Sequence, residues 1–77
     1  MIDLNKWQKH YWTTETRFYQ AELKQDIFQN WIIERYWGGL GKRGGRLLVH
    51  VTDSYQEASM ILQGITKKRI LRGYKIL

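Results

Sequence analysis

The sequence predicts an α+β domain: a small antiparallel β-sheet with one helix packed on one face. Two segments, residues 17–23 and 47–52, alternate along the chain as strands do, and the first has the pattern of a half-buried strand. After residue 53 the apolar residues instead follow the i, i+3, i+4, i+7 spacing of a helix. A chain of 77 residues is one small domain with a thin core.

Three strands are predicted before the helix. The first covers residues 17–23, with Tyr19, Ala21 and Leu23 on one face, and residues 24–29 suit a turn. The second covers residues 30–37, which are rich in aromatic and β-branched side chains. Its neighbours Ile32 and Ile33 are both apolar, which indicates a central strand covered on both faces. The third covers residues 47–52.

The N-terminal residues carry a weaker pattern. Trp7, Tyr11 and Trp12 are spaced i, i+4, i+5, which fits either one helical turn or an irregular segment lying over the core. We therefore expect residues 1–15 to be a lead-in and residues 16–77 to be the domain proper.

The helix has recognisable ends. Ser54 and Glu57 form the S-x-x-E pattern of a capping box, which begins a helix. The core-facing positions are Ala58, Ile61, Leu62 and Ile65. Gly73 is a suitable left-handed C-cap, and the apolar Tyr74 follows it. Residues 74–77 are expected to return as a short strand.

Charge is distributed unevenly along the chain. The net charge is +6, but residues 1–34 sum to −1 and residues 35–77 sum to +7. Such asymmetry favours a polyanionic partner, most often nucleic acid and less often an anionic membrane. A basic composition that only aids solubility is the alternative.

Five of the seven glycines lie in the segment RYWGGLGKRGGR, residues 35–46. Gly39, Gly41 and Gly44 formally match the dinucleotide fingerprint G-x-G-x-x-G, but that fingerprint requires a helix after the third glycine and LLVHV predicts a strand. A Walker loop is excluded because Arg43 follows Gly41-Lys42, where Ser or Thr is required. The segment is therefore a loop between two strands.

This loop contains the groups needed to hold a nucleic-acid strand. Its cations can pair with phosphates, and the backbone near its glycines allows an anion to approach closely. Trp37 offers a flat face, at the rim of the hairpin, on which a sugar or base can stack. The cations and glycines concerned are Arg35, Lys42, Arg43, Arg46, Gly38, Gly39 and Gly41. In the alternative interpretation, the glycines only turn the hairpin and Trp37 belongs to the core.

The same residues resemble the hallmark segment of WGR domains, in which an arginine, any residue, Trp-Gly-Arg, an aliphatic residue and glycine follow one another. Arg35, Trp37, Gly38, Leu40 and Gly41 match this pattern. The resemblance continues through Asp53-Ser54, Glu57-Ala58 and Arg72-Gly73-Tyr74, and so covers roughly residues 16–77.

The resemblance implies an antiparallel sheet with one helix and a role in nucleic-acid binding. In poly(ADP-ribose) polymerases this module sits at DNA ends, where the motif tryptophan packs on the sugar of a terminal nucleotide, a role that would fall to Trp37. The motif arginine, which helps to link the module to neighbouring domains there, is replaced by Gly39. The substitution is therefore expected to affect interdomain signalling more than the binding of a DNA strand. In space, Arg43 or Arg46 could take the place of the missing arginine.

Other chemistries find little support in the sequence. There is no cysteine, and His10 and His50 lie far apart, so no metal ligand set and no cofactor site are predicted. Ser54 is explained as a helix cap, and no catalytic constellation is evident. No apolar run is long enough for a membrane span, so a cytoplasmic location is expected.

The sequence thus predicts a non-catalytic module that binds DNA without sequence preference, at ends or nicks. The basic helix end, including Lys67 and Lys68, is expected to add a second phosphate-contacting patch. A protein-interaction module with the same aromatic and basic surface is the alternative. RNA is a third option, because no residue distinguishes a reader of 2′-hydroxyl groups.

Overall fold

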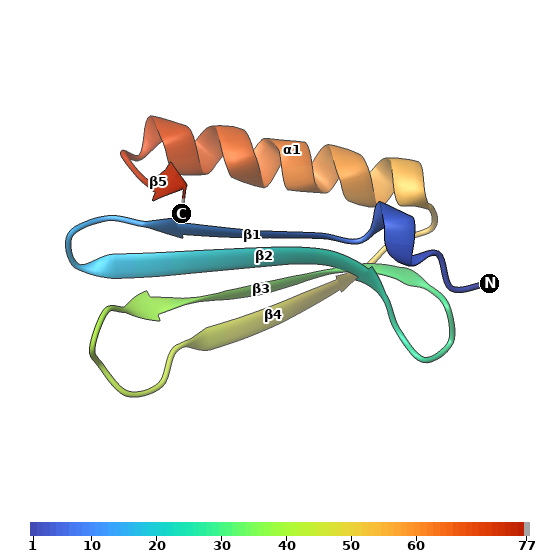
Figure 1. Cartoon of the computed structure of the whole chain (residues 1–77), viewed down its shortest axis with the longest axis horizontal. Helices are drawn as coiled ribbons and strands as arrows, with labels where there is room; N and C mark the ends of the chain where they lie inside the picture. The colour runs from blue at the N-terminus through green and yellow to red at the C-terminus, as the bar shows by residue number, and fades with distance from the viewer. Residues whose placement is uncertain (77) are drawn as a thin grey trace.

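The structure, a computed structural model, describes residues 1–76 as a five-stranded antiparallel sheet with one α-helix against it (Figure 1). The spatial order of the strands is β4-β3-β2-β1-β5. The elements in chain order are η1 (Leu4–Lys6, a 3-10 turn), β1 (Gln8–Thr13), β2 (Arg17–Gln25), β3 (Trp31–Gly39), β4 (Arg46–Val51), α1 (Tyr55–Leu71) and β5 (Lys75–Ile76). The predicted fold class is confirmed.

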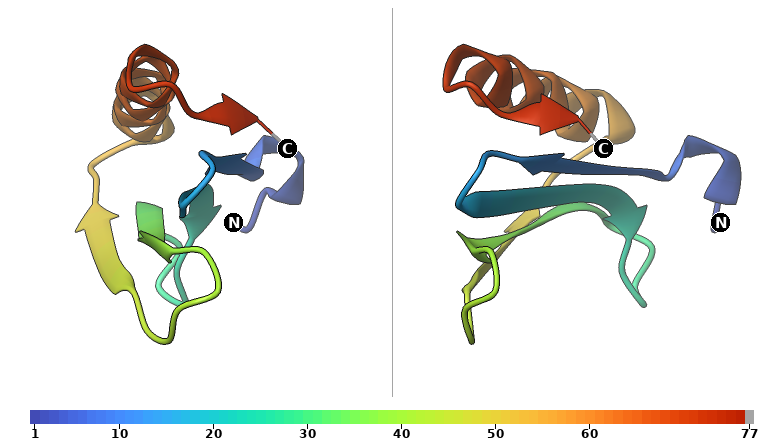
Figure 2. Two further views of the ribbon diagram at one scale, coloured as in Figure 1. Left: turned by 90° about the vertical axis from the view of Figure 1, so that its left-hand side faces the viewer. Right: turned by 60° about the vertical axis from the view of Figure 1, so that its left-hand side comes forward.

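The register of the sheet decides which side chains meet the helix. Leu23 lies opposite Ile33, and Tyr19 lies opposite Trp37. These side chains point to the side of the sheet on which α1 lies, which we call the helix side; the other is the open side (Figure 2). Neighbouring positions alternate between the two sides, because successive side chains of a strand point in opposite directions.

The core lies between the helix side and α1. Trp12, Leu23 and Ile33 are its largest fully buried side chains, and Ala58 and Leu62 join them from the helix. Burying one such aliphatic side chain contributes about 1.5–3 kcal/mol. Ile32, which points to the open side, is also buried, but Tyr36 on the same side is 37% exposed. The strand is central, as predicted, but it is covered on both faces only near its start.

The N-terminal segment differs from both forms expected for residues 1–12. Residues 8–13 form β1, which lies inside the sheet between β2 and β5. Its inward positions are Gln8, His10 and Trp12, and the two polar residues among them conceal the alternation of a strand. The expected boundary between residues 15 and 16 falls in the turn that joins β1 to β2.

Both helix ends form as their residues predict. The Ser54 hydroxyl accepts a hydrogen bond from the Glu57 amide (3.1 Å), and the Glu57 carboxylate accepts one from the Asp53 amide (3.2 Å). At the other end Gly73 has φ 86°, and the amides of Gly73 and Tyr74 donate to the carbonyls of Ile70 and Arg69. This is the hydrogen-bond pattern of a Schellman motif. It returns the chain to β1 as β5; the expected strand residue 77 lies outside the described residues.

Candidate nucleic-acid interface

An aromatic row crosses the helix side of the sheet and ends at a cation. Trp12 lies opposite Tyr19, Tyr19 opposite Trp37, and Trp37 opposite Arg46. Burial decreases along the row: Trp12 and Tyr19 are buried, Trp37 is half-buried and Arg46 is exposed. The row therefore leads from the core to the edge of the sheet, and Trp37 is its last aromatic ring.

The Trp37 indole is fixed on its inner side. It stacks on the Tyr19 ring with centroids 5.6 Å apart and planes inclined by 15°. The Arg35 guanidinium lies 5.6 Å from the Tyr19 centroid and 5.7 Å from that of Trp37. Trp37 is thus placed in the strand, two residues before its end and facing the helix side, rather than at the tip of the hairpin as its position in the motif suggests.

Arg35 is bound by protein groups. Its Nε donates a hydrogen bond to the Tyr19 hydroxyl, and its Nη1 lies 3.3 Å from Nε2 of His50. Since a guanidinium can only donate, the histidine nitrogen accepts this bond. Arg35 therefore holds the aromatic row in place, with two of its five N–H donors bound to Tyr19 and His50, and His50 is its structural partner.

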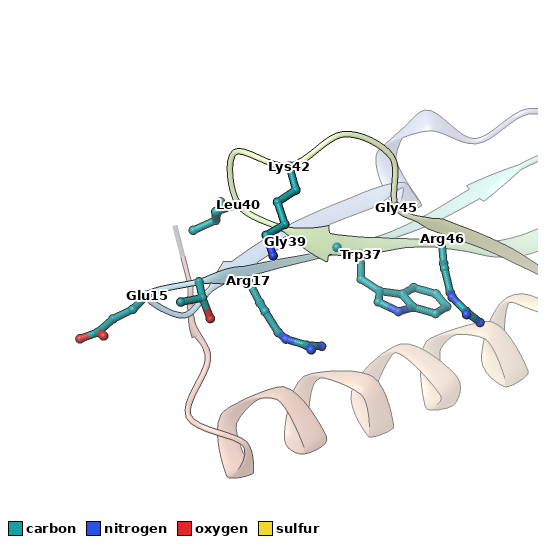
Figure 3. Close-up of a pocket in the computed structure, with 10 residues that line it drawn as sticks. Glu15, Arg17, Trp37, Gly39, Leu40, Lys42, Gly45 and Arg46 are labelled. Carbon is teal, nitrogen blue, oxygen red and sulfur yellow. The ribbon is translucent and has the colours of Figure 1, made fainter.

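An open depression with a volume of about 720 Å³ lies at this end of the sheet. The β1–β2 turn, the end of β3 and the start of β4 build it, and Arg17, Trp37 and Arg46 project from the sheet toward the helix side (Figure 3). We call it the Trp37 depression. Its lining residues are Glu15, Thr16, Arg17, Trp37, Gly38, Gly39, Leu40, Lys42, Gly45 and Arg46.

Two of the motif glycines belong to the sheet. Gly38 and Gly39 are the last residues of β3, opposite Phe18 and Arg17, and the next amide, of Leu40, donates to the Thr16 carbonyl (2.8 Å). A side chain at position 38 would lie 3.2 Å from the Phe18 ring and 3.3 Å from the Gly45 backbone, so glycine allows a close approach there. The irregular loop itself begins at Leu40, later than the sequence suggests.

Arg17 is a lining residue that the sequence analysis did not select. It stands opposite Gly39, the position at which the family motif has its arginine. The alternation of β2 places Arg17 on the same side as Tyr19, but only the pairing with β3 brings it beside the end of the motif. The neighbouring strand β2 thus places a cation beside Gly39, where the family motif has its arginine.

The remaining predicted cations are distributed over several surfaces. Arg43 is exposed at the tip of the loop, outside the lining of the depression. Lys67 borders a different hollow, between α1 and β1, together with Gln8 and His10. Lys68 is exposed and follows it on the helix, about 100° around the axis. The structure therefore places Lys42 and Arg46 at the Trp37 depression and Lys67 away from it.

Arg69, from the same basic helix end, is turned inward. It is 7% exposed, and its guanidinium lies 4.1 Å from the Tyr19 centroid and 5.0 Å from that of Tyr74. Its Nε has no hydrogen-bond partner within residues 1–76. Cation–π contacts with two rings partly offset the cost of burying this charge. Arg69 thus extends the aromatic row beneath the helix end.

Opposite charges gather at opposite ends of the molecule. The β1–β2 turn, the β3–β4 loop and the C-terminal end of α1 lie at one end, where Arg17, Lys42, Arg43 and Arg46 are exposed (Figure 1). The other end holds the β2–β3 turn, η1 and the N-terminal end of α1. Its acidic residues are Asp3, Asp26, Asp53 and Glu57. Sheet geometry therefore concentrates positive charge around the Trp37 depression.

Two carboxylates on the open side are neutralised locally. Glu22 and Glu34 lie directly opposite each other, and the Lys24 ammonium lies 3.4 Å from one and 3.1 Å from the other. Burial alone would lower the pKa of Lys24, but its hydrogen bond to Glu34 and the attraction of both carboxylates outweigh this and raise that pKa. Lys24 thus compensates the charge of both glutamates.

Within residues 1–76, no group of three or more histidine, aspartate or glutamate side chains is placed to hold a metal ion. No helix among these residues has the length and apolarity that crossing a bilayer requires.

Comparison with known families decides the relationship. The model of the WGR domain matches residues 3–76, essentially the whole described chain, including β1 and η1. The chain belongs to the WGR domain family. No curated protein and no solved structure matches it significantly. WGR domains are known from poly(ADP-ribose) polymerases and are associated with DNA binding, and the match contains no catalytic domain.

Proposed function

We propose that this WGR domain is a non-catalytic module that binds DNA without sequence preference, at ends or nicks, through the Trp37 depression. The observation that carries the proposal is the aromatic row, in which Trp37 is braced on Tyr19 inside the protein while its outer side meets Arg46 at an open hollow. A braced ring beside cations can receive a sugar or base without first being ordered.

The contacts follow from the chemistry of the lining. Arg17, Lys42 and Arg46 approach the depression from three different segments, so they can neutralise phosphates on more than one side of a strand. The Trp37 ring supplies an apolar surface for the terminal sugar or base. In this proposal Arg17 provides the charge that Gly39 lacks.

The restriction to ends and nicks follows from the position of Trp37. The Trp37 ring is half-buried and lies on the helix side of the sheet, two residues before the end of β3. The sugars and bases inside an intact duplex are flanked by neighbours on both sides, whereas a terminal nucleotide exposes one side. A recessed ring therefore fits a terminus better than a continuous helix.

The experiment titrates the protein with labelled nicked, blunt-ended and covalently closed circular duplexes of one sequence and follows anisotropy. We expect the nicked and blunt duplexes to bind more tightly than the circle. If about four to six phosphates are neutralised, log K should fall with log salt with a slope of roughly −4 to −5. Equal affinity for the circle, or binding insensitive to salt, contradicts the proposal. Tighter binding of an acidic polypeptide than of any duplex would instead identify a protein-interaction module.

Trp37→Ala tests the ring itself and should weaken end binding by about 1–3 kcal/mol, roughly 5- to 150-fold. Because Trp37 also packs on Tyr19, Trp37→Leu is the companion variant: it retains apolar volume and removes the aromatic face. Trp7→Ala is the matched control, since Trp7 is half-buried at the opposite end and bonds Gln25 (3.4 Å). Both Trp37 variants should lose affinity while circular dichroism shows a folded domain; loss in the Trp7 control alone contradicts the role of Trp37.

A further inference from the structure

The β4 strand forms an unprotected edge of the sheet. Within the described residues it pairs with β3 on one side and with nothing on the other. Natural edge strands are usually short, or protected by proline, bulges or charged side chains. The six residues RLLVHV contain no proline or glycine, and their one formal charge is on the first residue, Arg46. The other edge, β5, has only two residues.

The exposed side chains of β4 are aliphatic. Leu47, Val49 and Val51 are 61%, 46% and 66% exposed, and all three lie on the open side of the sheet, opposite Tyr36, Glu34 and Ile32. Leu48, on the helix side, is also 43% exposed, because the buried part of α1 packs on strands β1 to β3. An unpaired backbone edge and an apolar stripe therefore coincide on one strand.

The hydrogen-bond pattern of β4 fixes which groups face outward. The Thr52 amide donates to the Trp31 carbonyl (3.0 Å), and this pair continues the register in which Ile32 lies opposite Val51. Bonded and non-bonded pairs alternate along an antiparallel ladder. The even-numbered residues of β4 thus direct their N–H and C=O groups to β3. Leu47, Val49 and Val51 direct theirs to the free edge.

We propose that β4 is a dimerisation strand, through which two copies of this chain pair antiparallel about a two-fold axis at Val49. Only odd residues have outward groups, so any self-pairing must match odd with odd. Centred on Val49, the register places Leu47 opposite Val51 of the second copy and pairs all three outward residues, with about six backbone hydrogen bonds. The same pairing joins the two aliphatic stripes on the open side into one.

Electrostatics favours this register over its nearest competitor. Shifting the axis to Leu48 would put Arg46 opposite the second copy's His50, which already accepts from Arg35, and would leave Val51 facing a glycine. With the axis at Val49, Arg46 lies opposite Thr52, and the two Arg46 residues are about 20 Å apart along the strands. That separation exceeds the screening length of about 8 Å at physiological salt. The two basic loops are therefore kept apart.

The two copies would form one continuous sheet with both helices on the same side, and the Trp37 depressions would remain at its two ends. Because one strand pair is a small interface, we expect weak association. Sedimentation velocity of the wild-type chain should therefore be followed from about ten micromolar to one millimolar, where its mass should rise toward twice the monomer mass. A monomer over this whole range overturns the proposal.

Val49→Lys places two ammonium groups face to face at the axis and should keep the protein monomeric. Met60→Lys adds the same charge on the exposed face of α1, where Met60 is 72% exposed, and should dimerise like the wild type. Circular dichroism checks that both variants fold. Dimerisation of Val49→Lys equal to that of the control shows that another surface associates and overturns the proposal.

Cysteine variants test the register, because the chain has no cysteine of its own. In Val49→Cys the two Cα atoms would be about 5.5 Å apart, within reach of a disulfide. In Leu47→Cys they would be separated by about 13 Å along the strands alone, beyond that reach. Mild oxidation should therefore cross-link the first variant and leave the second largely monomeric on a non-reducing gel. Equal cross-linking of both, or of neither, overturns the register. The proposed DNA binding does not depend on this dimer, so either can fail alone.

Discussion

The two connections that flank β3 differ in how their backbones are held. In the β2–β3 turn, residues 26–30, the Asp26 carboxylate accepts bonds from the amides of Phe28 and Asn30 (both 2.9 Å) and from the Asn30 side chain (3.3 Å). The backbone adds reciprocal bonds between Asp26 and the end of the turn. Gln29 is held with a positive φ of 68° in this network.

The β3–β4 connection, residues 40–45, is held by its ends alone. The Leu40 amide bonds Thr16, and the Lys42 amide bonds Gly39 at a longer 3.3 Å. No side-chain hydrogen bond or salt bridge of residues 1–76 involves this loop. Its cations therefore keep their donors available.

The contrast shows two uses of a hairpin connection. At the acidic end, the side chains of Asp26 and Asn30 form hydrogen bonds within the turn. The tip of this turn presents Ile27 and Phe28, which are 89% and 78% exposed. At the basic end, the backbone turns with glycine and the charged groups remain free for a partner. The proposed function predicts that removing exposed cations at the basic end lowers DNA affinity but not stability, whereas removing the Asp26 carboxylate at the acidic end lowers stability but not affinity.

The largest expected effect is on affinity. Lys42→Ala with Arg46→Ala removes two cations of the Trp37 depression, and at about 0.1 M salt this should weaken duplex-end binding by about 60-fold, near 2.4 kcal/mol. The slope of log K against log salt should become less steep by about 1.8. Thermal unfolding should change little, since both side chains are exposed.

The double variant Lys6→Ala with Lys9→Ala is the charge-matched control. Both lysines are exposed and lie outside the depression, Lys6 in η1 beside Asp3 and Lys9 in β1 on the open side. Affinity and salt slope should stay close to wild type in this control. An equal loss in both variants would show that net charge, rather than the basic end, governs binding.

Much of the fold could be predicted from the sequence, but the Trp37 depression could not. The helix and its caps depend on contacts within a few residues, residues 17–23 carry local alternation, and the strand around Ile33 is rich in aromatic and β-branched side chains, so all of these were foreseen. The Trp37 depression depends on which residues lie opposite Gly39 and Trp37 across the sheet. Register is a long-range property, so Arg17 and the aromatic row remained hidden.

Strand β1 is a second feature that depends on long-range pairing and could not be predicted from local sequence. β1 presents Gln8 and His10 on its inward side, and only Trp12 is fully buried there. Its place in the sheet is set by pairing with β2 and β5 rather than by its own pattern. Similarly, the inward turn of Arg69 follows from the Tyr19 and Tyr74 rings meeting under the helix end, which a run of basic residues does not reveal.

A smaller effect, about 2 kcal/mol of folding free energy, is expected from Gly45→Ala. A β-carbon at position 45 would lie 2.8 Å from the Trp37 carbonyl oxygen and 3.0 Å from the Tyr36 ring, and the residue has φ 158°. The loop must shift to accept it, so chemical denaturation should show a lower midpoint, and end binding should weaken as well. Gly64→Ala is the control: it lies in α1 with no atom near the added carbon and should stabilise by about 0.5–1 kcal/mol. A denaturation midpoint for Gly45→Ala equal to that of the wild type would show that the loop shifts without a cost in folding free energy.

The smallest effect is expected at the acidic end. Asp26→Ala removes the acceptor of the bonds from Phe28, and from the Asn30 backbone and side chain, and should lower the folding free energy by about 1 kcal/mol, because these bonds are exposed to water. Asp26→Asn makes the same change in net charge but keeps a carbonyl oxygen where Oδ1 accepts both backbone bonds, so it should lose less. DNA affinity should be equal in the two variants, since the turn lies at the far end from the Trp37 depression. If Asp26→Ala bound DNA ends much more weakly than Asp26→Asn at equal net charge, the two ends would be coupled, and the separation of stability from binding would fail.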